Sequence, residues 1–276
     1  MMWDAAPQPT LSPISPAGWL RVVLRGSVLT VVVFGGLLIL LAVRLVERPL
    51  FGLHRPVTPW ITQGVCKAAF VILGIRREVR GAVMRGTGAV VSNHASWLDI
   101  FALNASKRIY FVSKAEVAGW PGIGWLARAT GTVFIRRDPR EARAQQALFE
   151  ARLQAGHRLL FFPEGTSTDG RRLLRFKPTL FQAFFSPALP AMQVQPVTLA
   201  YHAPPGTPEA FYGWWGDRGF ADHALRMLAQ APQGRIAVIY HAPLRVADHP
   251  GRKALAQAAE GAVRAGLVSE GLPSGR

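Results

Sequence analysis

From about residue 76 onward, short apolar runs alternate with amphipathic stretches. Runs with the length and content of β-strands lie at 88–93, 108–113, 132–136, 158–162, 194–201 and 235–241. Several are apolar at nearly every position, as expected of strands covered on both faces. Residues 138–156 carry apolar side chains at helical spacing, and 251–265 predict a weaker helix. The pattern predicts an α/β domain with a central, mostly parallel or mixed sheet flanked by helices.

The first 75 residues have a different pattern. Ser27–Val43 is an apolar run without a charged residue, just long enough to cross a bilayer. We expect a membrane helix rather than a signal peptide, because several prolines precede the run and no small-residue cleavage site follows it. Residues 59–75 predict a second helix that lies at the membrane interface. The expected division is a membrane-anchoring part, 1–75, and a second domain, 76–276; a buried helical hairpin of a soluble protein is the alternative.

Charge and cysteine content narrow the partners. Lysine and arginine outnumber aspartate and glutamate by 32 to 16, which gives a formal net charge of +16. Such a chain is attracted to anionic surfaces, and the apolar run favours membrane lipid over nucleic acid. An arginine-rich solvated face is the simpler explanation of the charge. The single Cys66 cannot form an intrachain disulfide, and no cysteine or histidine cluster has zinc-ligand spacing, so we expect no metal and a reducing cytoplasm.

An Asn-His pair lies where a predicted strand meets a predicted helix, in VVSNHASWLDI (90–100). Asp99 follows His94 by five residues and can be explained without chemistry, because Ser96 and Asp99 have the spacing of a helix capping box. Alternatively, the carboxylate holds one imidazole nitrogen and leaves the other basic toward a substrate hydroxyl. Residues five apart on one helix lie about 140° apart, so His94 must precede the helix for the two side chains to meet.

A glutamate directly follows another predicted strand, in LLFFPEGTSTDGRR (159–172). In doubly wound sheets, loops after the carboxyl ends of strands meet ligands. An ordinary turn would explain the proline, glycine and hydroxyl residues of this segment. It does not explain Glu164 or the basic residues that follow, which would suit an anionic group: Arg171, Arg172, Arg175 and Lys177.

Four blocks occur in order along the chain: NHASWLD (93–99), GTVFIRR (131–137), FPEGTS (162–167) and VQPVTL (194–199). Together they resemble the lysophosphatidate acyltransferase family of glycerolipid acyltransferases, whose blocks are N-H-x-x-x-x-D, G-x-x-F-I-x-R, F-P-E-G-T-R and a hydrophobic-x-Pro-hydrophobic segment. The resemblance covers about residues 76–245. The preceding helical pair is similar to the two-helix membrane anchor of this family.

The resemblance implies that a fatty acyl thioester, on acyl carrier protein or coenzyme A, is attacked directly by the free hydroxyl of a lysolipid. His94 would be the general base, and Asp99 would orient and stabilise the imidazolium. Further residues carry over for binding the acceptor: Glu164, Gly165, Thr166, Arg137 and Lys114. Neither a metal nor a cofactor is required beyond the acyl donor. The expected location is a bacterial inner membrane, with the catalytic domain on the cytoplasmic face.

One position departs from the family's pattern. The family's arginine after F-P-E-G-T, an expected phosphate contact, is Ser167 here. The segments FPEGTSTDGRRLLRFKPTLF and FYGWWGDRGFADHALRML look more like a bacterial subgroup that includes lyso-ornithine lipid acyltransferases, whose acceptor head group carries no phosphate. A Thr-Ser loop suits a carboxylate and amine, whereas the arginines downstream could restore a phosphate ligand. We expect lysophosphatidate as the acceptor, with lyso-ornithine lipid as the alternative.

Two other functions are compatible with parts of the sequence. A membrane-tethered protein could bind anionic lipid without catalysis, in which case replacement of His94 by alanine would leave lipid binding intact. A hydrolase could use Ser96 or Ser167, but neither lies in a G-x-S-x-G elbow. Trp214 and Trp215 fit either a lipid interface or the core. Acyl-chain length, the choice of donor and the oligomeric state are left open, as is whether 27–43 spans or re-enters the membrane.

Overall fold

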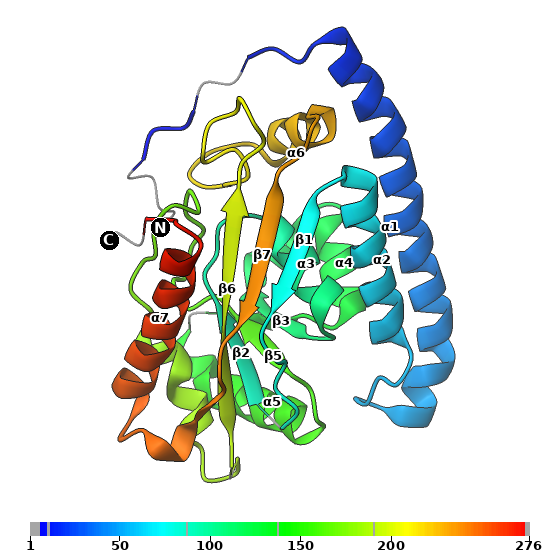
Figure 1. Cartoon of the computed structure of the whole chain (residues 1–276). Helices are drawn as coiled ribbons and strands as arrows, with labels where there is room; N and C mark the ends of the chain where they lie inside the picture. The colour runs from blue at the N-terminus through cyan, green and yellow to red at the C-terminus, as the bar shows by residue number, and fades with distance from the viewer. Residues whose placement is uncertain (1–5, 10–11, 87, 137, 190, 274–276) are drawn as a thin grey trace.

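The predicted strands all form, and they lie side by side in a sheet at the centre of the chain (Figure 1). The computed structural model describes residues 6–9, 12–86, 88–136, 138–189 and 191–273. Within this part of the chain, the strands of the sheet are β1 (Arg76–Arg80), β2 (Gly88–Ser92), β3 (Tyr110–Lys114), β4 (Val133–Ile135), β5 (Leu159–Phe161), β6 (Gln193–His202), β7 (Arg235–Tyr240) and β8 (Leu244–Arg245). The expected α/β class is confirmed.

The sheet is mixed, with the order β1-β7-β6-β2-β5-β3-β4 and β8 beside β6. β2 runs parallel to β5 and β6, and β3 runs parallel to β4 and β5. β7 is antiparallel to β6 and parallel to β1. The carboxyl ends of β2, β5 and β6 therefore meet at one edge of the sheet, the edge where the predicted site residues follow their strands.

Helices cover both faces of the sheet. They are α1 (Pro16–Phe51), α2 (Thr58–Leu73), α3 (Leu98–Ser106), α4 (Ile123–Thr130), α5 (Ala142–Gln154), α6 (Phe220–Ala229) and α7 (Arg252–Ser269), with 3-10 turns η1 (Ala115–Gly119), η2 (Pro139–Glu141), η3 (Pro178–Phe185) and η4 (Val246–Asp248). α5, α7 and η3 contribute to the core on one face, and α2, α3 and α6 to the core on the other. In β2, Ala89 and Val91 belong to the first core and Val90 to the second, as the two-residue period of a buried strand requires.

Two elements differ from the expectation. β1 has the charged sequence RREVR and gave no strand signal, yet it pairs with β7 along its whole length because an edge strand needs little apolar surface. Glu78 of β1 also pairs with Arg235 of β7. The predicted weak helix at the C-terminal end is α7, which extends to Ser269 and buries a stripe that includes Leu255, Ala259 and Val263.

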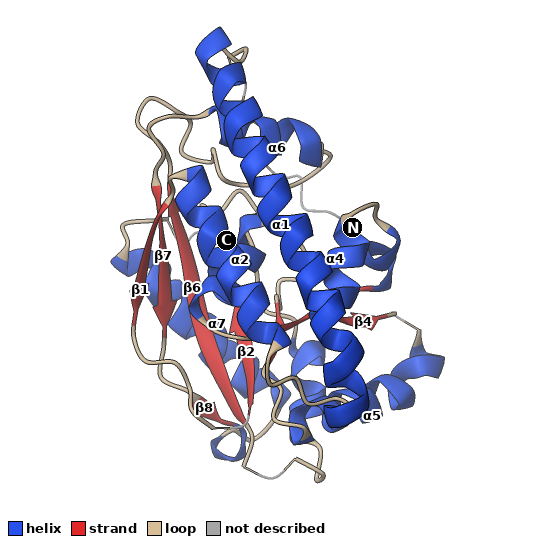
Figure 2. Cartoon of the chain, turned by 90° about the vertical axis from the view of Figure 1, so that its right-hand side faces the viewer, coloured by secondary structure: helices blue, strands red, loops and turns tan. Residues whose placement is uncertain are grey.

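The apolar run 27–43 lies inside α1, a helix of 36 residues. Its side-chain cap is Ser15, whose hydroxyl accepts a hydrogen bond from the Gly18 amide at 3.1 Å, and Pro16 opens its first turn. By length and composition α1 could cross a membrane: its most apolar window has a mean hydropathy of 2.6, and only 6% of that window is buried. Figure 2 shows α1 lying alongside α2 and beside α4 and α6.

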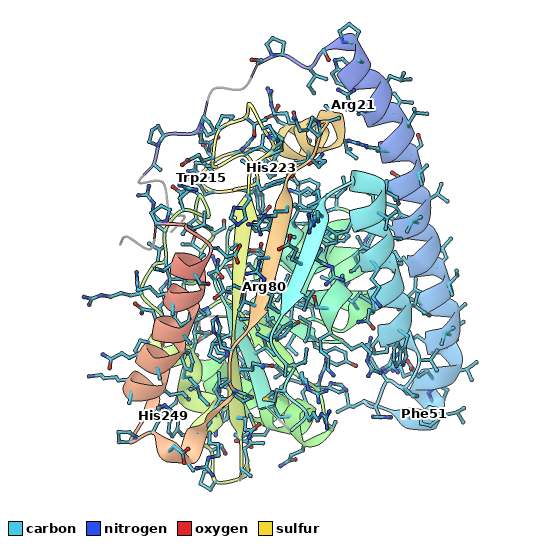
Figure 3. All side chains as sticks on the ribbon, viewed as in Figure 1. Arg21, Phe51, Arg80, Trp215, His223 and His249 are labelled. Atoms are coloured by element: carbon cyan, nitrogen blue, oxygen red, sulfur yellow. The ribbon has the colours of Figure 1, made fainter. Side chains whose placement is uncertain are left out.

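Polar contacts fasten both ends of α1. Near its start, Arg21 lies beside α6 (Figure 3), and its guanidinium donates to the carbonyl of Ala229 at 2.6 Å. The guanidinium of Arg25 donates to the carbonyl of Gln230 at 2.7 Å, so both residues bind the end of α6. Near its end, the buried Glu47 accepts from the backbone amide and the hydroxyl of Thr58 at the start of α2. α1 is therefore held along the side of the domain.

α2 is half core and half surface. Cys66, Phe70 and Leu73 enter the same core as α3, whereas Trp60 and Val71 are exposed. The apolar core thus crosses the expected boundary at residue 75. The division into residues 1–75 and 76–276 stays a prediction.

Candidate active site

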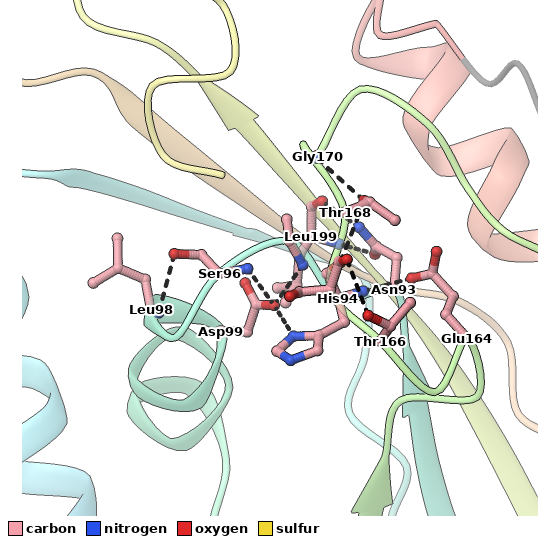
Figure 4. Close-up of polar contacts among 12 residues, drawn as sticks. Asn93, His94, Ser96, Leu98, Asp99, Glu164, Thr166, Thr168, Gly170 and Leu199 are labelled. Carbon is pink, nitrogen blue, oxygen red and sulfur yellow. Dashed lines mark hydrogen bonds and ion pairs between the residues drawn. The ribbon is translucent and has the colours of Figure 1, made fainter. Parts of the chain in front are cut away.

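The His94 loop leaves the carboxyl end of β2 and leads into α3, which begins at Leu98. His94 therefore precedes the helix, as contact with Asp99 requires. Asn93 anchors the start of this loop: its side-chain amide donates to the Leu199 carbonyl at 2.9 Å, and its side-chain oxygen accepts from the Leu199 amide at 2.8 Å (Figure 4). The asparagine of the NHASWLD block thus ties the end of β2 to β6.

His94 and Asp99 are in direct contact. Nδ1 of His94 lies 2.7 Å from Oδ2 of Asp99, and the aspartate is completely buried while the histidine side chain is 21% exposed. The same Oδ2 accepts from the amides of Ala95 at 2.8 Å and Ser96 at 3.1 Å. Asp99 therefore orders the first turn of α3 and also holds the imidazole, so the capping and the functional explanations both apply.

Tyr201, near the carboxyl end of β6, is a site residue that the sequence analysis missed. Its hydroxyl donates to Oδ1 of Asp99 at 2.6 Å. Burial raises the pKa of Tyr201 well above its usual value, and the negative charge of Asp99 adds to this, so the hydroxyl keeps its proton and remains a donor. The sequence did contain one indication of this role: a tyrosine near the end of an apolar buried strand, whose hydroxyl needs a polar partner when it is buried.

The backbone and ring of His94 are also fixed. Its amide donates to Oε1 of Glu164 at 2.7 Å, and its carbonyl accepts from the amide of Thr168 at 2.9 Å. The ring stacks on Phe162 with centroids 4.0 Å apart. A carboxylate can only accept, so Nδ1 is the imidazole nitrogen that donates toward Asp99, and in the neutral ring Nε2 carries the free lone pair. The site therefore presents an oriented imidazole whose Nε2 can act as a base.

Glu164 braces two loops from inside the protein. Only 1% of the residue is exposed; its Oε1 accepts from the amide of His94, and its Oε2 accepts from the amide of Leu174 at 2.8 Å. Burial raises the pKa of the Glu164 carboxyl to about 8, while the two amides act in the opposite direction. The contacts observed for this carboxyl are with the protein backbone, so direct binding of the acceptor by Glu164 stays a prediction.

Gly165 has a left-handed backbone conformation that a residue with a side chain would adopt only with strain. Its φ is 75°, and a Cβ there would lie 2.5 Å from Nζ of Lys177. The lysine side chain thus lies directly over the turn after β5. Thr166 and Ser167 follow in the same turn and are half-buried. Their expected contacts with the acceptor stay predictions.

The basic residues expected near the acceptor lie in different surroundings. Lys114 ends β3 and is exposed, and Arg137 lies outside the described residues. Arg171 forms an ion pair with Glu209 at 2.6 Å, and Arg172 forms one with Asp169 at 3.0 Å. Both arginines are thus already engaged by carboxylates in this structure, which weakens the case that they replace the arginine missing at position 167.

The structure also bears on the hydrolase alternative, on metal binding and on the two adjacent tryptophans. Ser96 is completely buried, and its hydroxyl accepts from the amide of Leu98 at 3.3 Å, which argues against its use as a hydrolase nucleophile. Among the residues that the structure describes, no group of three histidine, cysteine, aspartate or glutamate side chains could hold a metal ion. Trp215 is core, with 3% exposed, whereas Trp214 is half-buried.

Known proteins resemble this chain along most of its length. A family model described as acyltransferase matches residues 76–200. The lyso-ornithine lipid O-acyltransferase of Rhodobacter capsulatus is 58% identical over 267 residues, which are 96% of this chain and 97% of that protein. The protein of the same description from Pseudomonas aeruginosa is 35% identical, over 92% of this chain and 96% of its own length.

Two further likenesses are more distant. A 1-acyl-sn-glycerol-3-phosphate acyltransferase of Neisseria gonorrhoeae is 41% identical, but over only 42% of this chain and 47% of its own length. The crystal structure of PlsC, the 1-acyl-sn-glycerophosphate (LPA) acyltransferase of Thermotoga maritima, aligns with a TM-score of 0.65, covering 94% of this chain and 98% of that one. At 19% sequence identity this second likeness shows a shared fold.

Proposed function

The chain belongs to the acyltransferase family that contains the lysophosphatidate and lyso-ornithine lipid acyltransferases, and we propose that its own acceptor is lyso-ornithine lipid. It is an enzyme that transfers a fatty acyl group to the free hydroxyl of a lysolipid. The observation that carries this chemistry is the 2.7 Å contact between His94 and the buried Asp99, which leaves Nε2 of the imidazole as a base.

The identity of the acceptor is inferred from how much of this chain each relative matches and from the residue at position 167. The relatives from Rhodobacter capsulatus and Pseudomonas aeruginosa, whose sequences match this chain along almost its whole length, are described as lyso-ornithine lipid O-acyltransferases. The glycerophosphate relative from Neisseria gonorrhoeae matches less than half of the chain. These relatives favour the second of the two acceptors expected from the sequence. Ser167 fits this choice, because a head group without phosphate needs no guanidinium at that position.

In the proposed reaction, Nε2 of His94 takes the proton of the acceptor hydroxyl while its oxygen attacks the carbonyl carbon of the acyl thioester. Asp99 stabilises the imidazolium that forms, and Tyr201 holds the second carboxylate oxygen. The tetrahedral intermediate collapses by breaking the carbon–sulfur bond. The imidazolium then returns its proton to the departing thiolate, so that an ester and a free thiol are formed without a covalent acyl-enzyme.

The acyl donor and the location belong to the same proposal. The chain is associated with the membrane, as its exposed apolar helix α1 and its lipid-modifying relatives indicate. Acyl carrier protein and coenzyme A thioesters are both acidic cytosolic donors, and a net charge of +16 would attract either one. We place the catalytic domain on the cytoplasmic face of a bacterial inner membrane for this reason, with no cofactor other than the donor.

The proposal is tested by offering two acceptors separately to membranes that contain the protein, with one labelled acyl donor. We expect labelled product from lyso-ornithine lipid and little or none from lysophosphatidate. The His94→Ala variant should give neither product. Product from lysophosphatidate alone would contradict the proposed acceptor but not the proposed acyl transfer. Absence of His94-dependent product from both acceptors would contradict the proposed acyl transfer itself.

A further inference from the structure

Two exposed tryptophans lie on the segment between β3 and β4. Trp120 follows η1 and is 41% exposed, and Trp125 lies on α4 and is 60% exposed. In water-soluble proteins, large aromatic side chains are normally mostly buried. Tryptophan is, however, enriched where a protein meets the interface of a bilayer. These two residues therefore suggest a lipid contact outside the N-terminal helices.

The tryptophans continue the apolar surface of α1. Phe34 of α1 reaches α4, because its ring lies 3.9 Å from where a Cβ of Gly122 would be. Figure 2 shows α4 directly beside α1. In this region α1 exposes a row of apolar side chains, which includes Val31 at 71%, Phe34 at 40% and Leu38 at 69%. A membrane that covers this row would also meet α4.

The same segment is close to the catalytic loop. The ring of Trp120 lies edge-on to the ring of Trp214, with centroids 6.3 Å apart. The backbone amide of Trp214 donates to the carbonyl of Ala95 at 2.7 Å, and Ala95 is the neighbour of His94 in the chain. The exposed aromatic surface is thus connected to the base by two contacts.

Charge supports lipid as the occupant of this surface. Lys114 and Arg128 are exposed at the two ends of the segment 114–130, against one acidic residue, Glu116. The side chain of Arg128 also binds the carbonyl of Ala118, which joins the end of α4 to η1. Tryptophan together with basic side chains is the combination that binds the interface of an anionic bilayer.

We propose that the segment from η1 through α4 is a second membrane-docking element, which lies on the lipid bilayer beside α1 with Trp120 and Trp125 at the interface. This docking brings the lipid surface next to the His94 loop. A lysolipid could then present its hydroxyl to His94 while its hydrocarbon chain stays in the bilayer. The consequence for the lysolipid rests on the proposed acyl transfer, whereas the docking itself does not.

The docking is tested by fluorescence quenching in vesicles of phosphatidylethanolamine and phosphatidylglycerol. In a full-length Cys66→Ala background, Trp125→Cys is labelled with an environment-sensitive fluorophore. Leu38→Cys on α1 is the positive control, and Val268→Cys, 57% exposed on α7 at the opposite side of the molecule, is the negative control (Figure 1). We expect lipid-borne nitroxide to quench the labels at 125 and 38 but not at 268. A label at 125 that is quenched by aqueous iodide and not by the nitroxide lipid would overturn the proposal.

A second measurement connects docking with turnover. For Trp125→Glu we expect acyl transfer to a lysolipid in vesicles to fall at least about tenfold, and transfer to the same lysolipid in detergent micelles to fall much less. Val268→Glu should change neither rate. Equal losses in vesicles and micelles, or no loss in vesicles, would contradict docking. Absence of transfer by the unsubstituted chain would instead overturn the proposed function, and the quenching result would still decide on docking.

Discussion

Asp99 is the residue on which the candidate site depends. An ionised carboxylate offers about four lone-pair positions, and Asp99 uses four contacts: the imidazole of His94, the amides of Ala95 and Ser96, and the hydroxyl of Tyr201. Oδ2 takes three of these contacts and Oδ1 takes one, so both oxygens are held and the carboxylate is fixed in one orientation. The imidazole that it holds is therefore oriented before a substrate arrives, which is the condition for efficient proton transfer.

Removal of the Tyr201 hydroxyl should reduce turnover without loss of substrate binding. Tyr201→Phe leaves Oδ1 of Asp99 without its donor, and a hydrogen bond to a charged group contributes about 1.5–3 kcal/mol. We expect kcat to fall about tenfold, with KM for donor and acceptor little changed, in steady-state assays.

Tyr212→Phe is the matched control for this substitution. Tyr212 is also a buried tyrosine, but its hydroxyl donates to Gln233 and not to Asp99. The control should lower the melting temperature and leave kcat nearly unchanged. Equal losses of kcat in the two variants would mean that Tyr201 acts only through stability.

At the level of elements, periodicity predicted most of the structure. Each of the six runs predicted as strands from residue 88 onward contains a strand, and 138–156 contains α5 because its apolar residues recur at helical spacing. β1 was missed because hydrogen bonding to β7, rather than its own apolar content, holds the edge strand RREVR. Pattern alone cannot report such pairing between residues 76–80 and 235–239.

The candidate site was predictable in part. The spacing of His94 and Asp99 after a strand indicated their contact, which the structure contains. Tyr201 could not be assigned, because only the fold brings β6 beside β2 and places its hydroxyl against Asp99. The position of Glu164 after β5 was visible in the sequence. Its burial beneath the His94 loop was not, because that depends on the course of the chain to Leu174.

Glu164 links the two loops, and its substitution should destabilise the protein in a pH-dependent manner. In Glu164→Gln, the amide nitrogen would face one of the two backbone amides, which leaves a buried donor unpaired at a cost of about 1–3 kcal/mol. The folded pKa of about 8 lies above the usual value of 4.5, so the carboxyl contributes stability below pH 4.5 that is lost as the pH rises through about 8.

Thermal unfolding in detergent at pH 5 and pH 9 measures this effect. Glu164→Gln should melt below the unsubstituted chain at pH 5, and the difference should become smaller at pH 9, because only the glutamate can ionise. The exposed Glu209→Gln is the control and should show no comparable change with pH. A difference that grows with pH would show that the pKa of Glu164 is lowered rather than raised.

For the whole molecule, the course of α1 determines how the enzyme meets the membrane. Its contacts with α6, through Arg21 and Arg25, and its contact with α2, through Glu47, lie about 39 Å apart along the helix axis, at 1.5 Å per residue. Both belong to one folded body. A helix that crossed the bilayer would have one of these ends on the far side, so we expect α1 to lie along the membrane within one leaflet.

Cysteine labelling tests this arrangement. In the Cys66→Ala background, Ser12→Cys before α1 and His54→Cys after it should react with a membrane-impermeant maleimide from the same side of sealed vesicles. Both positions are exposed in the structure. Reaction of one position only from outside and of the other only from inside would mean that α1 spans the bilayer and that its contact with either α6 or α2 is broken in the membrane.

Direct attack by the acceptor hydroxyl, activated by His94, is measured most directly as thiol release from the acyl donor before and after lyso-ornithine lipid is added to the purified enzyme. With donor alone we expect no burst of thiol. After addition of the acceptor, thiol and acylated lipid should appear in equal amounts, and His94→Ala should release neither. A burst of thiol equal to the amount of enzyme before the acceptor is added would reveal a covalent acyl-enzyme and contradict the mechanism.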